Sequence, residues 1–170
     1  MGENIFEKFN NLFGEEGLAG LKDDVASAAS NTGEFVEVPK GEYEVKIVSR
    51  NDKKLNKRID GIHLGETGEK SKNPGMPMAQ VCFEILTGEY KGQKIFMNQM
   101  LTTGFGIHKM NEFLNSLETG IPVVFENFQQ YADLFAQIFS EIDGRGEFQL
   151  SYGETNKGYA TYDIIQRFTN

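Results

Sequence analysis

The chain has 170 residues, of which 39% are hydrophobic and 12% aromatic, and its formal net charge is −8. This length and composition indicate one folded domain with an extension and argue against a fully disordered chain. No stretch approaches the roughly 18 apolar residues of a membrane span, and the N-terminal MGENIFEKFNN lacks the basic and apolar regions of a signal peptide. With Cys82 as its single cysteine, the chain is expected to be cytoplasmic, with no membrane partner.

Residues 1–37 are predicted to form an amphipathic helix followed by a flexible linker. Apolar residues recur at helical spacing in NIFEKFNNLF, residues 4–13. The stretch that follows is rich in Gly, Ala and Ser, which is typical of a linker. The helix would dock on a partner or on a second copy of the chain, giving a homo-oligomer, or it would cap the core of its own domain. The sequence leaves these alternatives open.

Residues 38–170 are predicted to form the folded domain, which is mainly β with helices (α+β). Alternating apolar and polar residues predict five strands, at 41–50, 79–88, 93–101, 147–154 and 158–168. Helical spacing predicts two helices between the third and fourth strands, at 107–117 and 125–143. The segment 51–78 is polar, partly basic and rich in Gly and Pro, so it is interpreted as a long loop.

Three strands, helical material and two further strands follow the element order of an OB-fold barrel. We therefore expect an OB-fold-like five-stranded barrel with a helix between strands three and four. The long first strand favours closure, because it can bend and pair at both of its ends. An open α+β sheet with the same element order is the alternative.

The positive charge is concentrated in the centre of the chain. Residues 40–100 carry 11 basic and 8 acidic side chains, whereas residues 1–39 carry 2 and 8, and residues 101–170 carry 4 and 9. The distribution of charge matters more for nucleic-acid binding than the total does. The central region is therefore where a polyanion would bind.

Three motifs in this central region carry a resemblance to a known family. They are Pro39-Lys40-Gly41-Glu42-Tyr43 at the first strand, Asn73-Pro74-Gly75-Met76 before the second, and Gly88-Glu89-Tyr90-Lys91-Gly92 leading into Ile95-Phe96. Their order and spacing, over about residues 38–117, resemble a family of small phage and prophage proteins regarded as single-stranded-DNA-binding-like and encoded among replication and recombination genes. The resemblance implies a DNA-binding protein in the host cell cytoplasm, with a phage recombinase or replication protein as a candidate partner.

An OB-fold binds single strands across strands two and three, between the loop joining strands one and two and the loop joining strands four and five. Cationic side chains there would contact phosphates, and aromatic rings would stack on bases at about 1–3 kcal/mol per base. The candidate nucleic-acid-binding residues are Lys46 and Arg50 on strand one, Lys53, Lys54, Lys57, Arg58, Lys70 and Lys72 in the first loop, Tyr90, Lys91, Lys94 and Phe96 at strand three, and Lys157 and Tyr159 in the last loop.

Several of these candidates have a second interpretation. Phe96 has the opposite parity to Ile95 and Met97, which we expect in the core, so it either stacks on a base or packs under a helix. Tyr90 either stacks on a base or lies as a lid on the hydrophobic edge. The loop lysines either contact phosphates or are ordinary solvated residues, since acidic residues neighbour them.

No catalytic, cofactor or metal site is predicted. GETGEKS, residues 65–71, resembles a phosphate-binding loop, but Glu69 separates Gly68 from Lys70. His63 and His108 have no cysteine or carboxylate at ligand spacing. The expected function is therefore non-catalytic binding of single-stranded DNA with low sequence specificity. The alternative, favoured by the net charge of −8, is an acidic phage interaction module that inhibits or recruits a host or phage protein.

Overall fold

The computed structural model describes residues 37–53 and 56–168. The predicted N-terminal helix and linker, and the candidate residue Lys54, lie outside these residues. No helix within the described ranges is long and apolar enough to cross a membrane.

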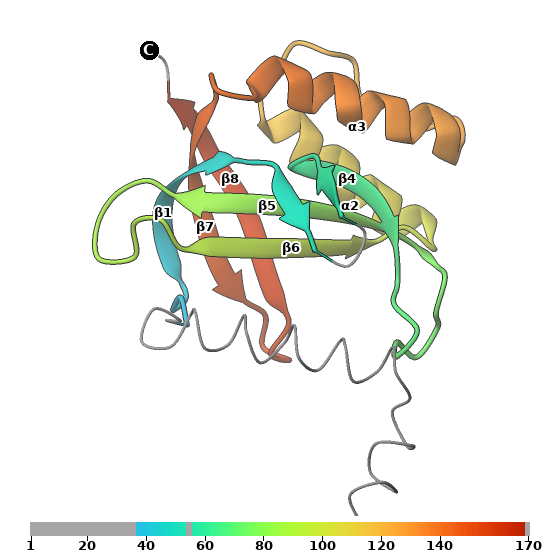
Figure 1. The fold of residues 1–170 in the computed structure, drawn as a ribbon, viewed down its shortest axis with the longest axis horizontal. Coiled ribbons are helices and arrows are strands. Elements are labelled where there is room, and N and C mark those ends of the chain that lie inside the picture. Colours follow the sequence, from blue (N-terminus) through green and yellow to red (C-terminus); the bar gives the residue numbers. More distant parts are fainter. Residues whose placement is uncertain (1–36, 54–55, 169–170) are drawn as a thin grey trace, which may run out of the picture. The chain divides into compact units, whose positions relative to one another are not determined.

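Six antiparallel strands form one sheet (Figure 1). They are β1 (Gly41–Ile47), β4 (Ile62–Glu66), β5 (Pro77–Ile85), β6 (Lys94–Met100), β7 (Glu147–Glu154) and β8 (Ala160–Phe168). β6 pairs with one edge of β5, and β4 and β1 share the other edge. β1 also pairs with β7, and β7 pairs with β8. In Figure 1, β5 and β6 cross β7 and β8, so the sheet is strongly coiled, with β6 and β8 at its two ends.

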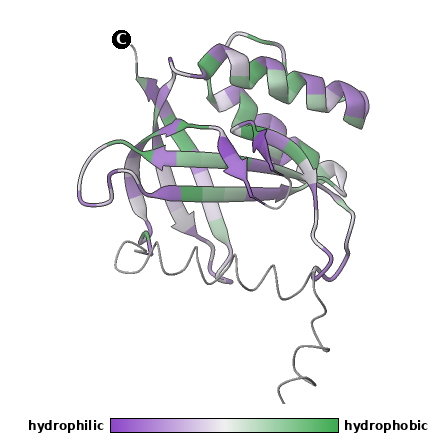
Figure 2. Ribbon diagram, in the orientation of Figure 1, coloured by the Kyte–Doolittle hydropathy of each residue, from purple (hydrophilic) through white to green (hydrophobic). Residues whose placement is uncertain are grey.

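Two helices connect β6 to β7, as the sequence predicts. α2 (Gly104–Ser116) and α3 (Phe128–Ile142) begin after Thr103 and Asn127, whose side chains each accept a hydrogen bond from a backbone N–H in the first turn. α2 contacts both β6 and β8, and α3 packs on β4. The buried face of α3 adds large apolar residues to the core, while Figure 2 shows the hydrophilic residues that the same helix carries.

A short hairpin, β2 (Arg50–Asp52) and β3 (Lys57–Ile59), lies between β1 and β4. Both flanks of the hairpin are bonded to the same residue of β5. The carbonyl of Cys82 accepts a hydrogen bond from the N–H of Val48 at 3.0 Å, and the N–H of Cys82 donates to the carbonyl of Gly61 at 3.0 Å. β1 and β4 therefore act as one strand along β5, interrupted by the hairpin.

The prediction of a long loop over residues 51–78 is wrong, because β3, β4, most of β2 and the start of β5 lie within it. The first strand also ends at Ile47 instead of residue 50. β2, β3 and β4 are short, and distant residues hold them in place. A Cβ on Gly61 would lie 2.7 Å from side-chain atoms of both Ile47 and Phe139. The chain can thus return from the hairpin to the sheet beneath α3 only with glycine at this position.

The expected closed barrel is not observed in the described part of the chain. β6 and β8 are not paired with each other there, and α2 contacts both of them. The ring of Phe113 on α2 lies edge-on to Phe83 of β5, with centroids 6.0 Å apart, and Tyr162 of β8 stacks on Phe83 at 6.5 Å. These ring contacts join β5 to α2 and to β8. The architecture is therefore mainly β with an open six-stranded sheet and two helices.

Candidate nucleic-acid interface

One face of β6 is exposed along the whole strand. Ile95 and Met97 are buried in the core, as predicted, so the alternate residues point outward. We call these exposed residues the β6 row, and they are Lys94, Phe96, Asn98 and Met100. The register places Glu84, Cys82, Gln80 and Met78 of β5 beside them in that order.

Phe96 carries an open aromatic face in the middle of the β6 row. It is 50% exposed, so burial under a helix does not describe it in this structure. The guanidinium carbon of Arg50 lies 5.9 Å from the ring centroid, and Arg50 also donates a hydrogen bond to Oε1 of Gln80 at 3.4 Å. A ring with a free face beside a cation can stack on a base while the cation contacts a phosphate.

The hairpin determines the position of Arg50. The sequence places Arg50 on the outward face of the first strand, but the structure assigns it to β2, paired with Ile59 of β3. Arg50 and Ile59 line a small pocket with Cys82 and Phe96, so the hairpin lies over this part of β5. The cation reaches Phe96 because the chain leaves the sheet after Ile47 and folds back.

Two lysines add positive charge at one end of the β6 row. Lys46 of β1 lies opposite Glu84 of β5, and Glu84 lies opposite Lys94 of β6. Lys46 Nζ is 3.4 Å from Glu84 Oε2, and this partly exposed ion pair contributes little to stability. One carboxylate between two ammonium groups leaves net positive charge. Lys46, Arg50, Lys94 and Phe96 are therefore the predicted residues that the structure brings together.

His63 is a functional candidate that the sequence analysis did not propose. It lies on β4 opposite Gln80, which is in turn opposite Asn98 of the β6 row. Burial, and then the charges of Lys57 and Arg50, lower the pKa of the half-buried imidazole. The alternation in IHLGE is the signal that could have revealed β4, but the five residues stand in a stretch rich in Gly and Pro.

The other predicted site residues lie on four segments, one of which is the hairpin that also carries Arg50, and on that hairpin Lys57 shares the face of Arg50. They are Lys53, Lys57 and Arg58 on the β2–β3 hairpin, Lys70 and Lys72 between β4 and β5, Lys91 between β5 and β6, and Lys157 with Tyr159 between β7 and β8. Arg58 is 3.5 Å from Asp143, at the end of α3, and strand alternation places it on the hairpin face opposite to Arg50. Tyr159 is 70% exposed. A DNA contact by these residues stays a prediction.

Tyr90 lies away from the β6 row and packs as a lid. Its ring is edge-on to that of Tyr43, with centroids 6.2 Å apart, and both rings pack against the hydrophobic core. This arrangement supports the lid interpretation over stacking on a base.

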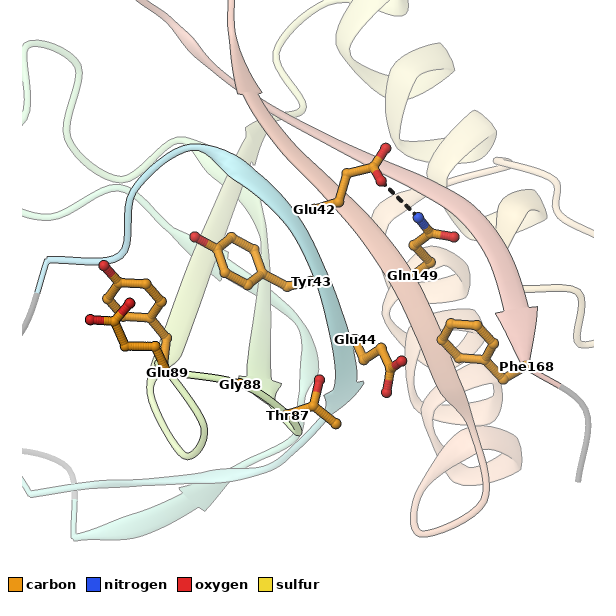
Figure 3. Close-up of a pocket in the computed structure, with 9 residues that line it drawn as sticks. Glu42, Tyr43, Glu44, Thr87, Gly88, Glu89, Gln149 and Phe168 are labelled. Atoms are coloured by element: carbon orange, nitrogen blue, oxygen red, sulfur yellow. Dashed lines mark hydrogen bonds between the residues drawn. The ribbon is translucent and has the colours of Figure 1, made fainter.

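Tyr43 and Tyr90 help to line a groove whose charged residues are all acidic, and we call it the acidic groove (Figure 3). Its volume is about 480 Å³, and Glu42, Glu44 and Glu89 are its carboxylates. Gln149 of β7 donates a hydrogen bond to Glu42 at 2.9 Å. The sequence gives no direct signal for this groove, because the pairing of β1 with β7 and the position of the β5–β6 turn create it.

Other chemistry has little support in the described residues. They contain no group of three or more His, Cys, Asp and Glu side chains that could hold a metal ion. Cys82 is buried, and burial raises the pKa of its thiol, which makes it a poor nucleophile. His108 lies 2.9 Å from Glu112 on the surface of α2.

Comparison with known proteins assigns no family to the chain. A scan against models of protein families found no match, and a search of curated proteins found no significant match. The functional argument therefore depends on the residues and on their geometry.

Proposed function

We propose that this protein binds single-stranded DNA, without catalysis and with low sequence specificity, during phage replication or recombination. The observation that carries the proposal is the half-exposed ring of Phe96 beside Arg50, on a face that also presents Lys46 and Lys94. The resemblance of three sequence motifs to phage proteins supports the setting: the cytoplasm of a host cell, with a recombinase or replication protein as partner. Self-association through residues 1–37 belongs to the same proposal.

The arrangement suits a single strand for a physical reason. Unpaired bases expose their faces, so a ring such as Phe96 can stack on any base and thereby bind without sequence preference. Arg50 and Lys94 flank this ring and would neutralise neighbouring phosphates. Asn98 and Gln80, side by side on β6 and β5, can donate and accept hydrogen bonds to base edges.

We also infer that the sheet is an OB-like barrel left open between β6 and β8. In this assignment β1 and β4 together take the place of the first strand, β5 and β6 the second and third, and β7 and β8 the last two. The antiparallel pairs β1–β5, β5–β6, β1–β7 and β7–β8 support it. An OB-fold binds oligonucleotides across its second and third strands, which is the face that carries the β6 row.

The substitution Phe96→Ala tests the proposal. Its binding to a labelled dT oligonucleotide would be measured by fluorescence anisotropy at low salt and compared with that of the unmodified chain. We expect the Kd to rise roughly 5- to 150-fold, because one stacked base is worth about 1–3 kcal/mol. The Kd of the unmodified chain should also rise steeply with salt, because bound phosphates release counterions.

Phe128→Ala is the matched control for this experiment. Phe128 is also exposed, at the start of α3, and lies edge-on to Phe125 with centroids 5.2 Å apart. The control variant should bind as tightly as the unmodified chain. A chain that ignores dT oligonucleotides at low salt, or a Phe96→Ala variant that binds them unchanged, would rule the proposal out.

The acidic groove favours a second candidate, an interaction module that binds a basic segment of a host or phage protein. Three carboxylates and two tyrosine rings line it, and the chain has a net charge of −8. The test is capture of the same host or phage protein by the unmodified chain but not by a Glu42→Gln/Glu44→Gln/Glu89→Gln variant. Equal capture by both would exclude the groove as the contact.

A further inference from the structure

A second exposed ring with a cation above it lies at the start of α2. Phe105 is 70% exposed, and Lys109 Nζ is 5.4 Å from its ring centroid. Phe96 and Arg50 form the same kind of pair on the β6 row, at 5.9 Å. Such an exposed ring contributes nothing to the hydrophobic core, so its packing does not explain why phenylalanine stands at this position.

The β6 row leads directly to Phe105. Met100 ends the row, and α2 begins so close to it that a Cβ on Gly106 would clash with the carbonyl oxygen of Met100. Asn98 lines the small pocket that contains Phe96 and Arg50, and it also lines a groove that contains Phe105 and Lys109. The two ring-and-cation pairs are therefore connected through Asn98.

The groove beside Phe105 has a volume of about 510 Å³ and lies between β6, α2 and β8. Its polar side chains include Asn98, Gln99 and Thr161, which can donate to or accept from a base edge. It also contains the carboxylates of Glu112 and Asp163. These would repel phosphates, so a strand would turn its bases into the groove and keep its backbone outside.

Alternate backbone groups of β6 face away from β5, toward the open edge of the sheet. The N–H of Ile85 donates to the carbonyl of Gln93, and the N–H of Leu101 donates to that of Pro77. In an antiparallel pair, hydrogen-bonded residues alternate with residues whose backbone groups face the other edge. The N–H and C=O of Phe96 and Asn98 thus face the open edge of the sheet, where base edges could bond with them.

We propose that the single strand continues from Phe96 over Asn98 and Met100 to a second stacking position on Phe105, with Lys109 contacting a phosphate beside it. This inference rests on the proposed DNA-binding function and extends it by a second nucleotide subsite. Phe96 and Met100 are four residues apart, which is about 13.6 Å along a strand. Contact with both rings therefore requires a longer oligonucleotide than contact with Phe96 alone.

The test is a series of labelled dT oligonucleotides of increasing length, titrated against the unmodified chain and the Phe105→Ala, Phe96→Ala and Phe128→Ala variants. We expect Phe105→Ala to bind the shortest oligonucleotides as the unmodified chain does. Longer oligonucleotides should bind this variant roughly tenfold more weakly, because one stacking contact is lost. In the Lys109→Gln variant, the slope of log K against log salt should become shallower by about 0.7 for the long oligonucleotides. The slope for the short oligonucleotides should not change.

The outcomes separate this inference from the proposed function. If Phe96→Ala weakens binding while Phe105→Ala matches the unmodified chain at every length, the DNA-binding function stands and the second subsite is wrong. The same result is expected if the groove beside Phe105 binds a peptide strand in place of DNA. If the unmodified chain binds no oligonucleotide, both proposals fall. Because Phe105 is largely exposed, an unchanged melting temperature should show that its substitution leaves the fold intact.

Discussion

The β6 row and the acidic groove lie on connected strands, yet they differ in charge and in the packing of their rings. In the row, the ring of Phe96 is open and Arg50 lies beside it. In the groove, Tyr43 and Tyr90 contact each other, and the charged residues are carboxylates. The sign of the charge changes along one strand, because Glu44 lines the groove and Lys46, two residues later on β1, pairs with Glu84 beside the row.

This difference shows why a net charge of −8 does not decide the partner of this chain. Exposed charges act over about one Debye length, roughly 8 Å at physiological salt, so a polyanion responds to the residues close to its path. The carboxylates Glu42 and Glu44 lie beside β7 and the cations lie beside β5 and β6, so in the proposed function they would direct a phosphate backbone toward β6. In the same proposal, the acidic groove would limit how far a bound strand extends toward β7.

Among changes of charge, the largest expected effect comes from reversing the charge beside the row. In an Arg50→Glu/Lys94→Glu variant, two phosphate contacts are lost, so the affinity for a dT oligonucleotide at 50 mM salt should fall roughly 50-fold. The slope of log K against log salt should become shallower by about 1.4. Anisotropy titrations at several salt concentrations measure both quantities.

Arg145→Glu provides the control, because Arg145 is exposed in the turn that follows α3. One charge reversal there should leave the slope unchanged. If Arg145→Glu changed the slope of log K against log salt by half as much as the double variant does, the effect per substitution would be the same. Total charge would then govern binding. The contrast between the two regions would then have no functional meaning.

The main strands and both helices could be predicted because their apolar spacing is regular over several residues. Val81, Phe83 and Ile85 alternate on β5, and all three are buried. The hairpin and β4 could not be predicted in this way. β2 and β3 have three residues each, too few to show an alternation of apolar and polar residues. The buried Ile59 and Ile62 are separated by Asp60 and Gly61, which do not suggest a strand. The failure of β6 to pair with β8 depends on the packing of α2, which no local pattern encodes.

The candidate site was predictable where strand alternation alone decides it. Side chains alternate between the two faces of a strand, so Phe96 and Lys94 are exposed because Ile95 between them faces the core. The position of Arg50 over Phe96 depends on the hairpin, and the position of His63 beside Gln80 depends on the register of β4 with β5. For Tyr90 the sequence left a lid and a stacking ring as alternatives, because its contact with Tyr43 joins residues distant in sequence. Residues that a site gathers from different strands become visible only once the register is known.

Neutralising the acidic groove should have a smaller effect in the opposite direction. In a Glu42→Gln/Glu44→Gln/Glu89→Gln variant, repulsion of the bound strand decreases, so dT affinity at low salt should rise about threefold. The gain should disappear at high salt, because these carboxylates would act at a distance through screened charge.

A control variant with the same change in net charge uses acidic residues of the helical region. It replaces Glu126, Asp133 and Glu141 by the corresponding amides. Equal gains from the two variants would contradict a local role for the acidic groove. A loss of affinity in the groove variant would indicate that the three substitutions disturb the fold of the proposed DNA-binding face.

The smallest expected effect is a dependence on pH through His63. Its pKa in the folded protein lies below the ordinary value, because burial and the charges of Lys57 and Arg50 disfavour the imidazolium. The native state therefore favours neutral His63. The stability that this provides is present above the unfolded pKa of about 6.5 and is lost as the pH falls toward the lower folded value.

DNA binding should change with pH in the opposite sense, because a phosphate beside Arg50 and His63 would stabilise the imidazolium. Between pH 7.5 and 5.5 the affinity for dT should rise about twofold, the effect of one charge at about 10 Å in water. With oligonucleotides too short to reach α2, His63→Gln should abolish this rise, whereas His108→Gln should retain it, since His108 lies on α2 beside Glu112. If both variants retain the rise, His63 does not face the bound strand, and the basic region ends at Arg50.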